Sequence, residues 1–346
     1  MKRAIQLAKR GQGTASPNPI VGAVVVKNNF VIGEGFHLKR GEDHAEVVAI
    51  RSATESVSGA TLFCTLEPCC HTKKLTPPCT ELIIGSGISK VVIGSKDVNP
   101  EVSGKGIELL KSAGIEVISG VLENECTHLN KPFNKFMKTG NPFIHLKVAM
   151  TLDGRMATDS NSSKWITSEY ARSEVHDLRK KYDAVLIGRQ TLLSDNPSLN
   201  TRSGNKVIKE NYKIILGSGK GISDSLNIFR DTSKVHVITN DQSSWGDLEI
   251  PKENVHSLGN DITAALTEIA KRGILSILVE GGPRTISTFI REDIYDCITF
   301  FISPKLIGNG SSVYMSNEVQ EMENALNLDG QWRIGKSNEA IYEVEK

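Results

Sequence analysis

The sequence lacks the features that would tie the chain to a membrane or to nucleic acid. No run approaches the roughly 18 apolar residues of a membrane span, and the first ten residues contain no apolar core of a signal peptide. The formal net charge is only +1, which gives no case for a nucleic-acid or membrane-surface partner. We therefore expect neither a membrane protein nor a nucleic-acid-binding protein.

Cysteine is scarce and unevenly placed. The 346 residues contain six cysteines, of which three are clustered with a histidine. This pattern favours metal chemistry in a reducing compartment over a disulfide framework, and so predicts a cytoplasmic protein. Cys64, Cys126 and Cys297 are interpreted as incidental buried thiols. The chain also has no GxGxxG motif, because the glycines of 217–221 have the wrong spacing.

The segment from His44 to Cys79 carries the residues of an open zinc site. His44, Cys69 and Cys79 offer three nitrogen and sulfur ligands, which leave the fourth position of a tetrahedral Zn²⁺ to water. Bound zinc lowers the pKa of that water to roughly 7 and supplies hydroxide at neutral pH. Glu46 follows His44 by two residues and can move protons without ligating the metal. The residue types and their order match zinc deaminases, although nine residues separate Cys69 from Cys79.

Two other interpretations of this segment stay open. A closed structural zinc site could use Cys69, Cys70, His71 and Cys79, or the cysteines could be small buried hydrophobic residues with no metal. Glu46 favours the catalytic interpretation, because a structural site has no use for such a carboxylate.

The first half of the chain alternates between predicted helices and strands. A short N-terminal helix precedes a turn-rich loop and a hairpin that turns at Asn28–Asn29. The later elements expected are helices at 44–56, 79–84 and 106–113 and strands at 60–66, 90–94 and 115–118. The pattern predicts an α/β fold with a partly parallel sheet and helices on both faces. It also places His44 and Cys79 at helix N-termini, which favour anionic side chains and lower a thiol pKa.

A polar stretch at 124–141, broken by Pro132, predicts a domain boundary. At this length two domains are expected, and we place them at 1–140 and 141–346. The second half is again α/β without repeating the first. Its expected strands are 143–149, 183–188, 212–216, 235–239, 274–280 and 297–303, and its expected helices are 169–180, 262–271 and 284–291.

Two short motifs of the second half are ambiguous by themselves. Gly281–Thr285 follows an apolar strand and opens a helical pattern, so its backbone N–H groups could hold a phosphate, but a plain tight turn explains it equally well. Asp195–Pro197 is a common turn sequence. Arg179, Arg189 and Arg202 recur around it and could suit a phosphorylated substrate.

Together, the motifs resemble the bifunctional deaminase–reductase family of riboflavin biosynthesis over essentially the whole chain. The matching motifs of the first half are Thr14–Val24, His44–Glu46, Thr65–Cys69, Thr76–Cys79 and Asp97–Gly106. Those of the second half are Lys147–Arg155, Ser163–Ser168, Gly188–Arg202, Glu280–Pro283 and Ser303–Gly308. The resemblance implies an α/β fold with an N-terminal cytidine-deaminase-like three-layer domain and a C-terminal dihydrofolate-reductase-like domain.

The resemblance also implies two reactions. The first domain would deaminate 2,5-diamino-6-ribosylamino-4(3H)-pyrimidinone 5′-phosphate by zinc-dependent hydrolysis. The second would reduce the ribosyl group to ribityl with NADPH, giving 5-amino-6-(5-phosphoribitylamino)uracil. The implied cofactors are Zn²⁺ and NADPH, the partner is a small phosphorylated pyrimidine, and the chain is expected to form a homo-oligomer, a dimer or a tetramer.

Site residues follow position by position from the matched motifs. The zinc ligands are His44, Cys69 and Cys79, and the catalytic groups are Glu46, Lys147 and Asp153. Pyrimidine contacts are expected from Asn18, Asp97 and Asn99. NADP contacts are expected from Ala149, Trp165, Thr191, Asp195, Ser218, Gly282, Pro283, Arg284, Thr285, Ile286, Ser287 and Thr288. Contacts with the sugar phosphate are expected from Ser163, Arg179, Leu199, Arg202 and Glu280.

The chain departs from the family pattern at two places. The family usually reads Pro-Cys-x-His-x-Gly-basic-Thr-Pro-Pro-Cys, whereas 69–79 is one residue longer and lacks the glycine. Gly217 stands where the family has an aspartate, beside the expected contact of Ser218. Two other classes remain alternatives: a single-activity zinc nucleobase deaminase with a non-catalytic second domain, and a non-enzymatic protein stabilised by zinc.

Overall fold

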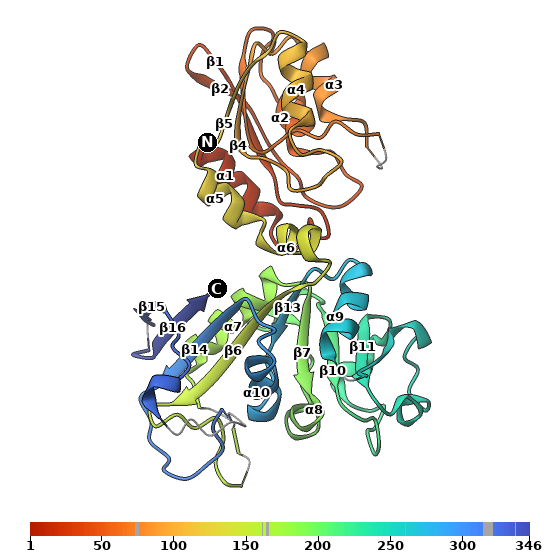
Figure 1. Ribbon diagram of the computed structural model, residues 1–346, viewed down its shortest axis with the longest axis vertical. Helices are drawn as coiled ribbons and strands as arrows, with labels where there is room; N and C mark the ends of the chain where they lie inside the picture. Colours follow the sequence, from red (N-terminus) through yellow and green to blue (C-terminus); the bar gives the residue numbers. More distant parts are fainter. Residues whose placement is uncertain (73–75, 161, 164–165, 260, 314–320, 336) are drawn as a thin grey trace. The chain divides into compact units, whose positions relative to one another are not determined.

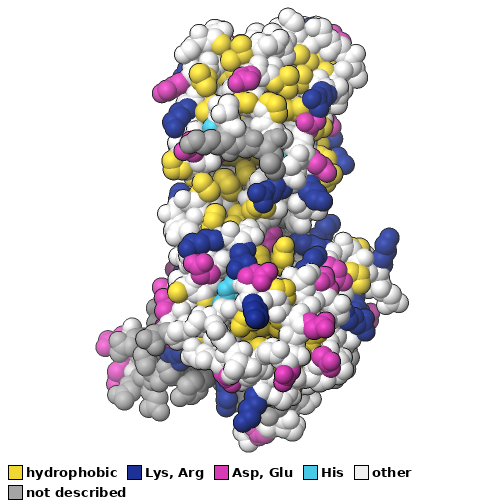
Figure 2. Space-filling model, turned by 90° about the vertical axis from the view of Figure 1, so that its right-hand side faces the viewer, with side chains coloured by type: hydrophobic (Ala, Val, Ile, Leu, Met, Phe, Trp, Pro, Cys, Tyr) yellow, Lys and Arg dark blue, Asp and Glu magenta, His cyan; other side chains and the backbone are white. Residues whose placement is uncertain are grey.

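A computed structural model describes residues 1–346 except 73–75, 161, 164–165, 260, 314–320 and 336 (Figure 1). The chain divides into two compact units, Met1–Gly140 and Asn141–Lys346. Within the described residues, every helix is too short or too polar to cross a membrane. Basic and acidic side chains are interspersed over the face shown in Figure 2, as expected for a net charge of +1.

The first unit is built on a five-stranded sheet of order β2-β1-β3-β4-β5. Its strands are β1 (Gly22–Lys27), β2 (Phe30–Phe36), β3 (Thr61–Leu66), β4 (Lys90–Ser95) and β5 (Glu116–Ser119). β1 runs antiparallel to β2 and β3, whereas β3, β4 and β5 are mutually parallel. The β1–β2 turn uses Asn28 and Asn29 at φ 50° and 67°, a left-handed conformation that asparagine tolerates better than most residues.

Helices cover both faces of this sheet, so the predicted three-layer α/β arrangement is confirmed (Figure 1). The helices of the unit are α1 (Lys2–Ala8), α2 (Ala45–Arg51), α3 (Cys79–Gly85), α4 (Lys105–Ser112), α5 (Glu123–Leu129) and α6 (Lys131–Thr139). Alternate strand residues face opposite layers. Ala23 and Val25 of β1 belong to the core beneath α2, α3 and α4, whereas Val24 packs with Ala4 and Leu7 of α1.

One helix prediction for this unit was wrong in its extent. The helix expected at 44–56 ends at Arg51, because the chain turns back onto β2 and the Thr54 N–H donates to Ile32 O. The polar stretch at 124–141 is mostly helical, and the two units divide near its end, between Gly140 and Asn141. Asn130 is buried there and exchanges hydrogen bonds with both backbone groups of Ile20, at 2.8 and 3.0 Å.

The second unit contains a nine-stranded sheet of order β12-β11-β10-β7-β13-β6-β14-β16-β15. The strands are β6 (Phe143–Thr151), β7 (Ala184–Gly188), β10 (Tyr212–Leu216), β11 (Val235–Thr239), β12 (Val255–Ser257), β13 (Ser276–Val279), β14 (Cys297–Ser303), β15 (Gly330–Ile334) and β16 (Ala340–Glu345). A separate hairpin joins β8 (Thr201–Ser203) to β9 (Lys206–Lys209). All strands from β12 to β14 are parallel, and β16 and β15 extend the sheet antiparallel.

Two apolar cores lie on opposite faces of this sheet. The longer α-helices of the unit are α7 (Glu169–Lys181), α8 (Arg189–Asp195), α9 (Ile262–Lys271) and α10 (Pro283–Arg291). Leu186 faces the core formed with α9 and α10, whereas the next residue, Ile187, faces the core that contains Leu192 of α8. The strands meet at a common edge at their carboxyl ends, and this edge carries most of the expected site residues of the unit.

Candidate active sites

The first site forms where α2 and α3 begin, beside the carboxyl end of β3. His44 is the N-cap of α2, and Cys79 is the first residue of α3 and fully buried. Cys69 follows β3 and lies between them. The two sulfurs are 3.3 Å apart, and His44 Nδ1 lies 3.4 Å from Cys69 Sγ and 3.3 Å from Cys79 Sγ. These three side chains are the candidate metal-ligand group among the described residues.

The spacing of these atoms fits a zinc ion. With Zn–S bonds of about 2.3 Å and a Zn–N bond of about 2.0 Å, tetrahedral ligand atoms lie about 3.5–3.8 Å apart, so only a small expansion of the observed triangle is needed. Thr76 Oγ1 lies 3.2 Å from His44 Nε2. This second contact orients the ring with Nδ1 toward the sulfurs, as an outer partner of a metal ligand does.

The geometry does not support a closed zinc site that uses Cys70 and His71 as additional ligands. Cys70 Sγ turns to the backbone oxygen of Glu101, at 3.8 Å, and His71 Nδ1 is buried without a hydrogen-bond partner. Neither joins the group of His44, Cys69 and Cys79. Among the described residues, this triangle therefore leaves the fourth ligand position of a tetrahedral zinc ion open.

Glu46 lies in the first turn of α2, where its side chain is only 3% exposed. Burial raises the pKa of its carboxyl group above the ordinary range, and the nearby Cys69 raises it further. We call the group of His44, Cys69 and Cys79 the metal triangle. A carboxyl group with a raised pKa beside it suits proton transfer near neutral pH.

The sequence interpretation missed His37, which links the expected substrate residue Asn18 to the metal triangle. Its Nε2 lies 3.0 Å from Asn18 Nδ2, its Nδ1 lies 3.1 Å from the backbone oxygen of Asp43, and its ring meets that of His44 edge-on at 5.2 Å. His37 is 3% exposed, and burial lowers its pKa. No motif spacing marked this residue, because its contacts are made only in the fold.

The sequence interpretation also gave no role to Glu67, which organises the loop of Asp97 and Asn99. Its buried carboxylate accepts hydrogen bonds from the backbone N–H groups of Asp97 at 3.3 Å, Gly104 at 3.0 Å and Ile107 at 3.2 Å. Asp97 in turn accepts the Asn99 N–H at 2.8 Å, and burial raises the pKa of Asp97 to about 6. The loop is thus held at the carboxyl end of β4 by Glu67, a residue two positions before the ligand Cys69.

In the second unit, the expected cofactor residues gather where the strand order reverses. The chain passes from β7 outward through β10, β11 and β12, and then returns to place β13 between β7 and β6. Crevices at such a switch point, outside the carboxyl ends of the strands, are where α/β sheets bind ligands. Ala149 lies near the end of β6, Thr191 lies in α8, and Gly282 caps α10.

The turn into α10 approaches β7 very closely. A Cβ atom on Gly188 would lie 2.4 Å from Thr285 Oγ1. A side chain at 188 would therefore force Thr285, in the first turn of α10, to move. The remaining expected residues of the turn, Pro283, Arg284, Ile286, Ser287 and Thr288, all belong to the same helix, α10.

Other expected cofactor residues lie at different distances from this turn. Ser218 follows β10 and donates to Asp241 Oδ2 at 3.1 Å and to Ser244 Oγ at 3.2 Å. Asp195 is the exposed last residue of α8. Trp165 lies outside the described residues, and Ser163 is described and half-buried.

A buried ion pair lies at the end of β13. Arg179 of α7 donates to both carboxylate oxygens of Glu280, at 2.6 and 2.9 Å, and its third nitrogen donates to Asn200 O at 3.1 Å. Burial alone would raise the pKa of Glu280, but the guanidinium outweighs it and holds that pKa below its usual value. Burial lowers the pKa of Lys147, the neighbouring residue on β6, against the attraction of Glu280.

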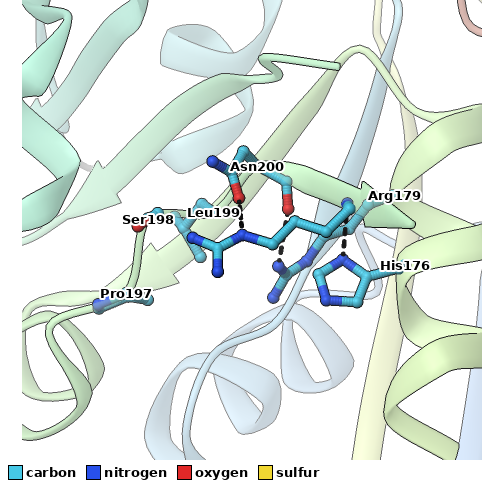
Figure 3. Close-up of a pocket in the computed structure, with 7 residues that line it drawn as sticks. His176, Arg179, Pro197, Ser198, Leu199 and Asn200 are labelled. Carbon is cyan, nitrogen blue, oxygen red and sulfur yellow. Dashed lines mark hydrogen bonds between the residues drawn. The ribbon is translucent and has the colours of Figure 1, made fainter. Parts of the chain in front are cut away.

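A pocket of 210 Å³ opens beside this ion pair (Figure 3). It is lined by His176, Arg179, Pro197, Ser198, Leu199, Asn200 and Arg202. Leu199 is buried at a φ of 53°, and Arg202 Nε donates to Asn200 Oδ1 at 2.9 Å. The structure thus brings together Arg179, Leu199, Arg202 and Glu280.

Asp153 lies in the turn after β6. Its carboxylate accepts hydrogen bonds from Thr151 Oγ1 at 2.5 Å and from the backbone N–H of Gly308 at 2.8 Å and of Ile307 at 3.2 Å. The Thr151 hydroxyl is the largest cause that lowers the pKa of Asp153. This carboxylate therefore ties the 305–310 segment to the turn.

Comparison with known proteins places these sites in a family. Residues 142–338 match the family model of the RibD C-terminal domain, and residues 1–95 match the cytidine and deoxycytidylate deaminase zinc-binding region. The riboflavin biosynthesis protein RibD of Aquifex aeolicus is 42% identical over 316 residues, which cover 90% of this chain and 88% of that protein. The chain belongs to the RibD family.

Solved structures agree over nearly the full length. RibD of Acinetobacter baumannii superposes with a TM-score of 0.89 at 36% identity, covering 99% of this chain and 97% of that one. A Thermotoga maritima diaminohydroxyphosphoribosylaminopyrimidine deaminase/5-amino-6-(5-phosphoribosylamino)uracil reductase superposes with a TM-score of 0.88 at 40% identity, covering 100% and 97%.

This RibD family member is a bifunctional enzyme of riboflavin biosynthesis, a deaminase and a reductase that acts on a small molecule. Its cofactors are Zn²⁺ and NADPH. The expectation of two activities is confirmed, and the alternatives with a non-catalytic second domain or with no activity are excluded.

Proposed function

We propose that the first unit converts 2,5-diamino-6-ribosylamino-4(3H)-pyrimidinone 5′-phosphate to 5-amino-6-(5-phosphoribosylamino)uracil, and that the second unit reduces this product to 5-amino-6-(5-phosphoribitylamino)uracil. The observation that carries the proposal is the metal triangle with its buried glutamate in one unit and the basic pocket at a sheet switch point in the other. The name of the Thermotoga maritima relative, which states both substrates, supports it.

In the first unit, His44, Cys69 and Cys79 would hold zinc through one nitrogen and two sulfurs. Zinc bound there lowers the pKa of a water molecule to roughly 7. The Glu46 carboxylate would take one proton from the attacking water and pass it to the ring nitrogen. It would then take the proton of the hydroxyl group formed on the ring carbon and pass it to the departing amine. Asn18, held by His37, and the Asp97–Asn99 loop orient the pyrimidine.

The test of this half is Glu46→Gln. The variant should bind zinc as the wild type does, because Glu46 is not in the ligand triangle, but should release no ammonia from the diaminopyrimidinone substrate. Glu55→Gln, at an exposed position, is the control. Metal analysis and an ammonia assay decide the outcome, and turnover in the zinc-loaded Glu46 variant would rule out this role.

In the second unit, NADPH would supply the hydride that opens ribosyl to ribityl. The cofactor phosphates would lie near the first turn of α10. The cofactor would contact Ala149, Trp165, Thr191, Asp195, Ser218 and 282–288. Backbone N–H groups at a helix start suit phosphate, and the close approach at Gly188 supports a crevice there.

The sugar phosphate would lie in the pocket of Arg202, Leu199 and Arg179, with Ser163 and Glu280 at the same end of the sheet. Reduction also consumes a proton, and we assign its delivery to Lys147. Two observations support this role: no described residue accepts a hydrogen bond from its Nζ, and burial lowers its pKa. Asp153 would act by holding the 305–310 segment beside the site.

A coupled assay with the diaminopyrimidinone phosphate tests both halves together. Ammonia release and NADPH oxidation should both be seen, and a zinc chelator should abolish deamination while leaving reduction of added 5-amino-6-(5-phosphoribosylamino)uracil intact. Ammonia without NADPH oxidation would contradict the residues proposed in the second unit.

The proposal extends to assembly and location. β15 is an edge strand whose residues are all exposed, including Trp332 at 65% and Ile334 at 73%. An uncovered apolar edge of this kind favours pairing with a second chain, so a homo-oligomer, a dimer or a tetramer, is proposed, in the cytoplasm. Light scattering of wild type and Trp332→Lys would test it, and a wild-type monomer would contradict it.

A further inference from the structure

The pocket beside Arg179 has few hydrogen-bond donors to offer a ligand. Three guanidinium hydrogens of Arg179 are taken by Glu280 and Asn200 O, and Arg202 Nε is taken by Asn200 Oδ1. The carboxylate of Glu280 also balances the charge of Arg179. Arg202 has no carboxylate partner among the described residues, so a phosphate in this pocket would bind to this cation. It would also need further hydrogen-bond donors.

His176 lies on α7 and lines the same pocket. The backbone N–H of Arg202 donates to His176 Nδ1 at 3.2 Å. An imidazole nitrogen that accepts a hydrogen bond carries no proton, so in the neutral ring the proton is on Nε2. No described residue accepts a hydrogen bond from Nε2.

The surroundings of His176 favour the neutral ring. Burial, followed by the charge of Arg179, lowers its pKa. Protonation would also put a hydrogen on Nδ1 against the Arg202 N–H. Figure 3 shows the ring beside the side chain of Arg179, with a dashed line at the nitrogen that accepts a hydrogen bond.

We infer that His176 is a further substrate-binding residue of the reductase, which donates its Nε2–H to the 5′-phosphate beside Arg202. The same ring positions Arg202, because its Nδ1 holds the backbone N–H of that residue. The inference rests on the proposed function, since it assumes that the substrate phosphate enters this pocket.

Two substitutions separate the functions of the two ring nitrogens. His176→Asn places an amide oxygen near the position of Nδ1 and keeps the acceptor for Arg202, but it has no donor at the position of Nε2. His176→Gln reaches the position of Nε2 with an amide donor. Asp177→Asn, at the exposed neighbouring position on α7, is the surface control.

The experiment measures reductase kinetics by NADPH oxidation with 5-amino-6-(5-phosphoribosylamino)uracil and with its 5′-hydroxyl counterpart. His176→Asn should raise KM for the phosphorylated substrate about tenfold or more, the loss expected for a hydrogen bond to a charged group. Its kcat, its KM for NADPH and its KM for the 5′-hydroxyl compound should stay within about twofold of wild type. His176→Gln should recover part of the loss, because it restores the donor but not the acceptor of the Arg202 N–H.

Three outcomes would overturn the inference. A His176→Asn enzyme with unchanged KM would show that Nε2 binds nothing, and a loss seen in His176→Gln but not in His176→Asn would show that the ring acts only through the Arg202 backbone. In both cases Arg202→Gln should still raise KM for the phosphorylated substrate, which leaves the proposed function standing. Equal wild-type KM values for the two substrates would instead show that the pocket does not bind the phosphate. That result would overturn both this inference and the proposed phosphate site.

Discussion

Replacing Glu67 by glutamine should impair the deaminase through the loop that Glu67 holds. The carboxylate uses both oxygens: Oε2 accepts from Asp97 and Gly104, and Oε1 accepts from Ile107. Glutamine has one oxygen and one NH₂ group. In either orientation at least one buried backbone N–H then faces another donor.

The magnitude follows from these three bonds. A hydrogen bond to a charged group contributes about 1.5–3 kcal/mol, and a buried donor left unsatisfied costs a similar amount. Losing one bond outright and the charge from the other two gives about 3–5 kcal/mol of local destabilisation. α4 cannot move closer to the segment after β3 to compensate, because the two backbones already touch. A Cβ atom on Gly106 would lie only 2.3 Å from Pro68 O. If only about 1.4 kcal/mol of this appears in substrate binding, KM rises tenfold.

The assay compares ammonia release, zinc content and NADPH oxidation in one preparation of Glu67→Gln. We expect KM for deamination to rise at least tenfold, zinc to remain bound, and reduction of 5-amino-6-(5-phosphoribosylamino)uracil to be unchanged. Glu81→Gln, an exposed glutamate of α3, is the matched control. Unchanged deamination would refute the loop argument, and zinc lost in proportion to activity would show that Glu67 acts through Cys69 instead.

Three further predictions test other buried contacts. Because burial raises the pKa of Asp97 from 3.8 to about 6, the folded state binds its proton more tightly than the unfolded state, and ionisation above pH 6 costs roughly 3 kcal/mol of stability. Asp97→Asn should therefore be more stable than wild type to urea at pH 8 but not at pH 4, and an equal difference at both would contradict this. Gly188→Ala should raise KM for NADPH by displacing Thr285 without affecting deamination, and an unchanged KM would place the cofactor elsewhere. Glu280→Gln leaves Arg179 buried without its carboxylate, which should lower the free energy of unfolding of the second unit by about 3–5 kcal/mol in calorimetry. A decrease below about 1 kcal/mol would mean that water reaches the ion pair.

The strands and helices that the sequence predicted best are those with strong local patterns. The bounds expected for β10, β11, β14 and α9 are those observed, because near-continuous apolar runs and a helical period identify buried elements. The misses lie where tertiary contacts decide. The helix α8 was not predicted, and only the turn at its end was named. The helix buries a single residue, Leu192, so its sequence has no apolar helical period. The last two strands, β16 and the edge strand β15, were not predicted, because an exposed strand such as β15 has little apolar alternation.

The same division holds for the sites. The ligands His44, Cys69 and Cys79 could be named from local motifs, since metal-ligand chemistry restricts which residue types serve. His37, Glu67 and His176 could not, because each acts through a partner from another element. A histidine or glutamate outside a motif has no sequence signal that separates a surface group from one that positions a ligand.

Motifs also cannot tell a carboxylate that touches the substrate from one that holds the residue that does. Glu280 and Asp153 were both expected near the reacting sugar, yet one is paired with Arg179 and the other with the backbone of 307–308. Lys147 has no such partner among the described residues, and burial lowers its pKa, which makes loss of its proton easier. Since the reduction needs one proton in addition to the hydride, these contacts favour Lys147 over either carboxylate as the group that supplies it.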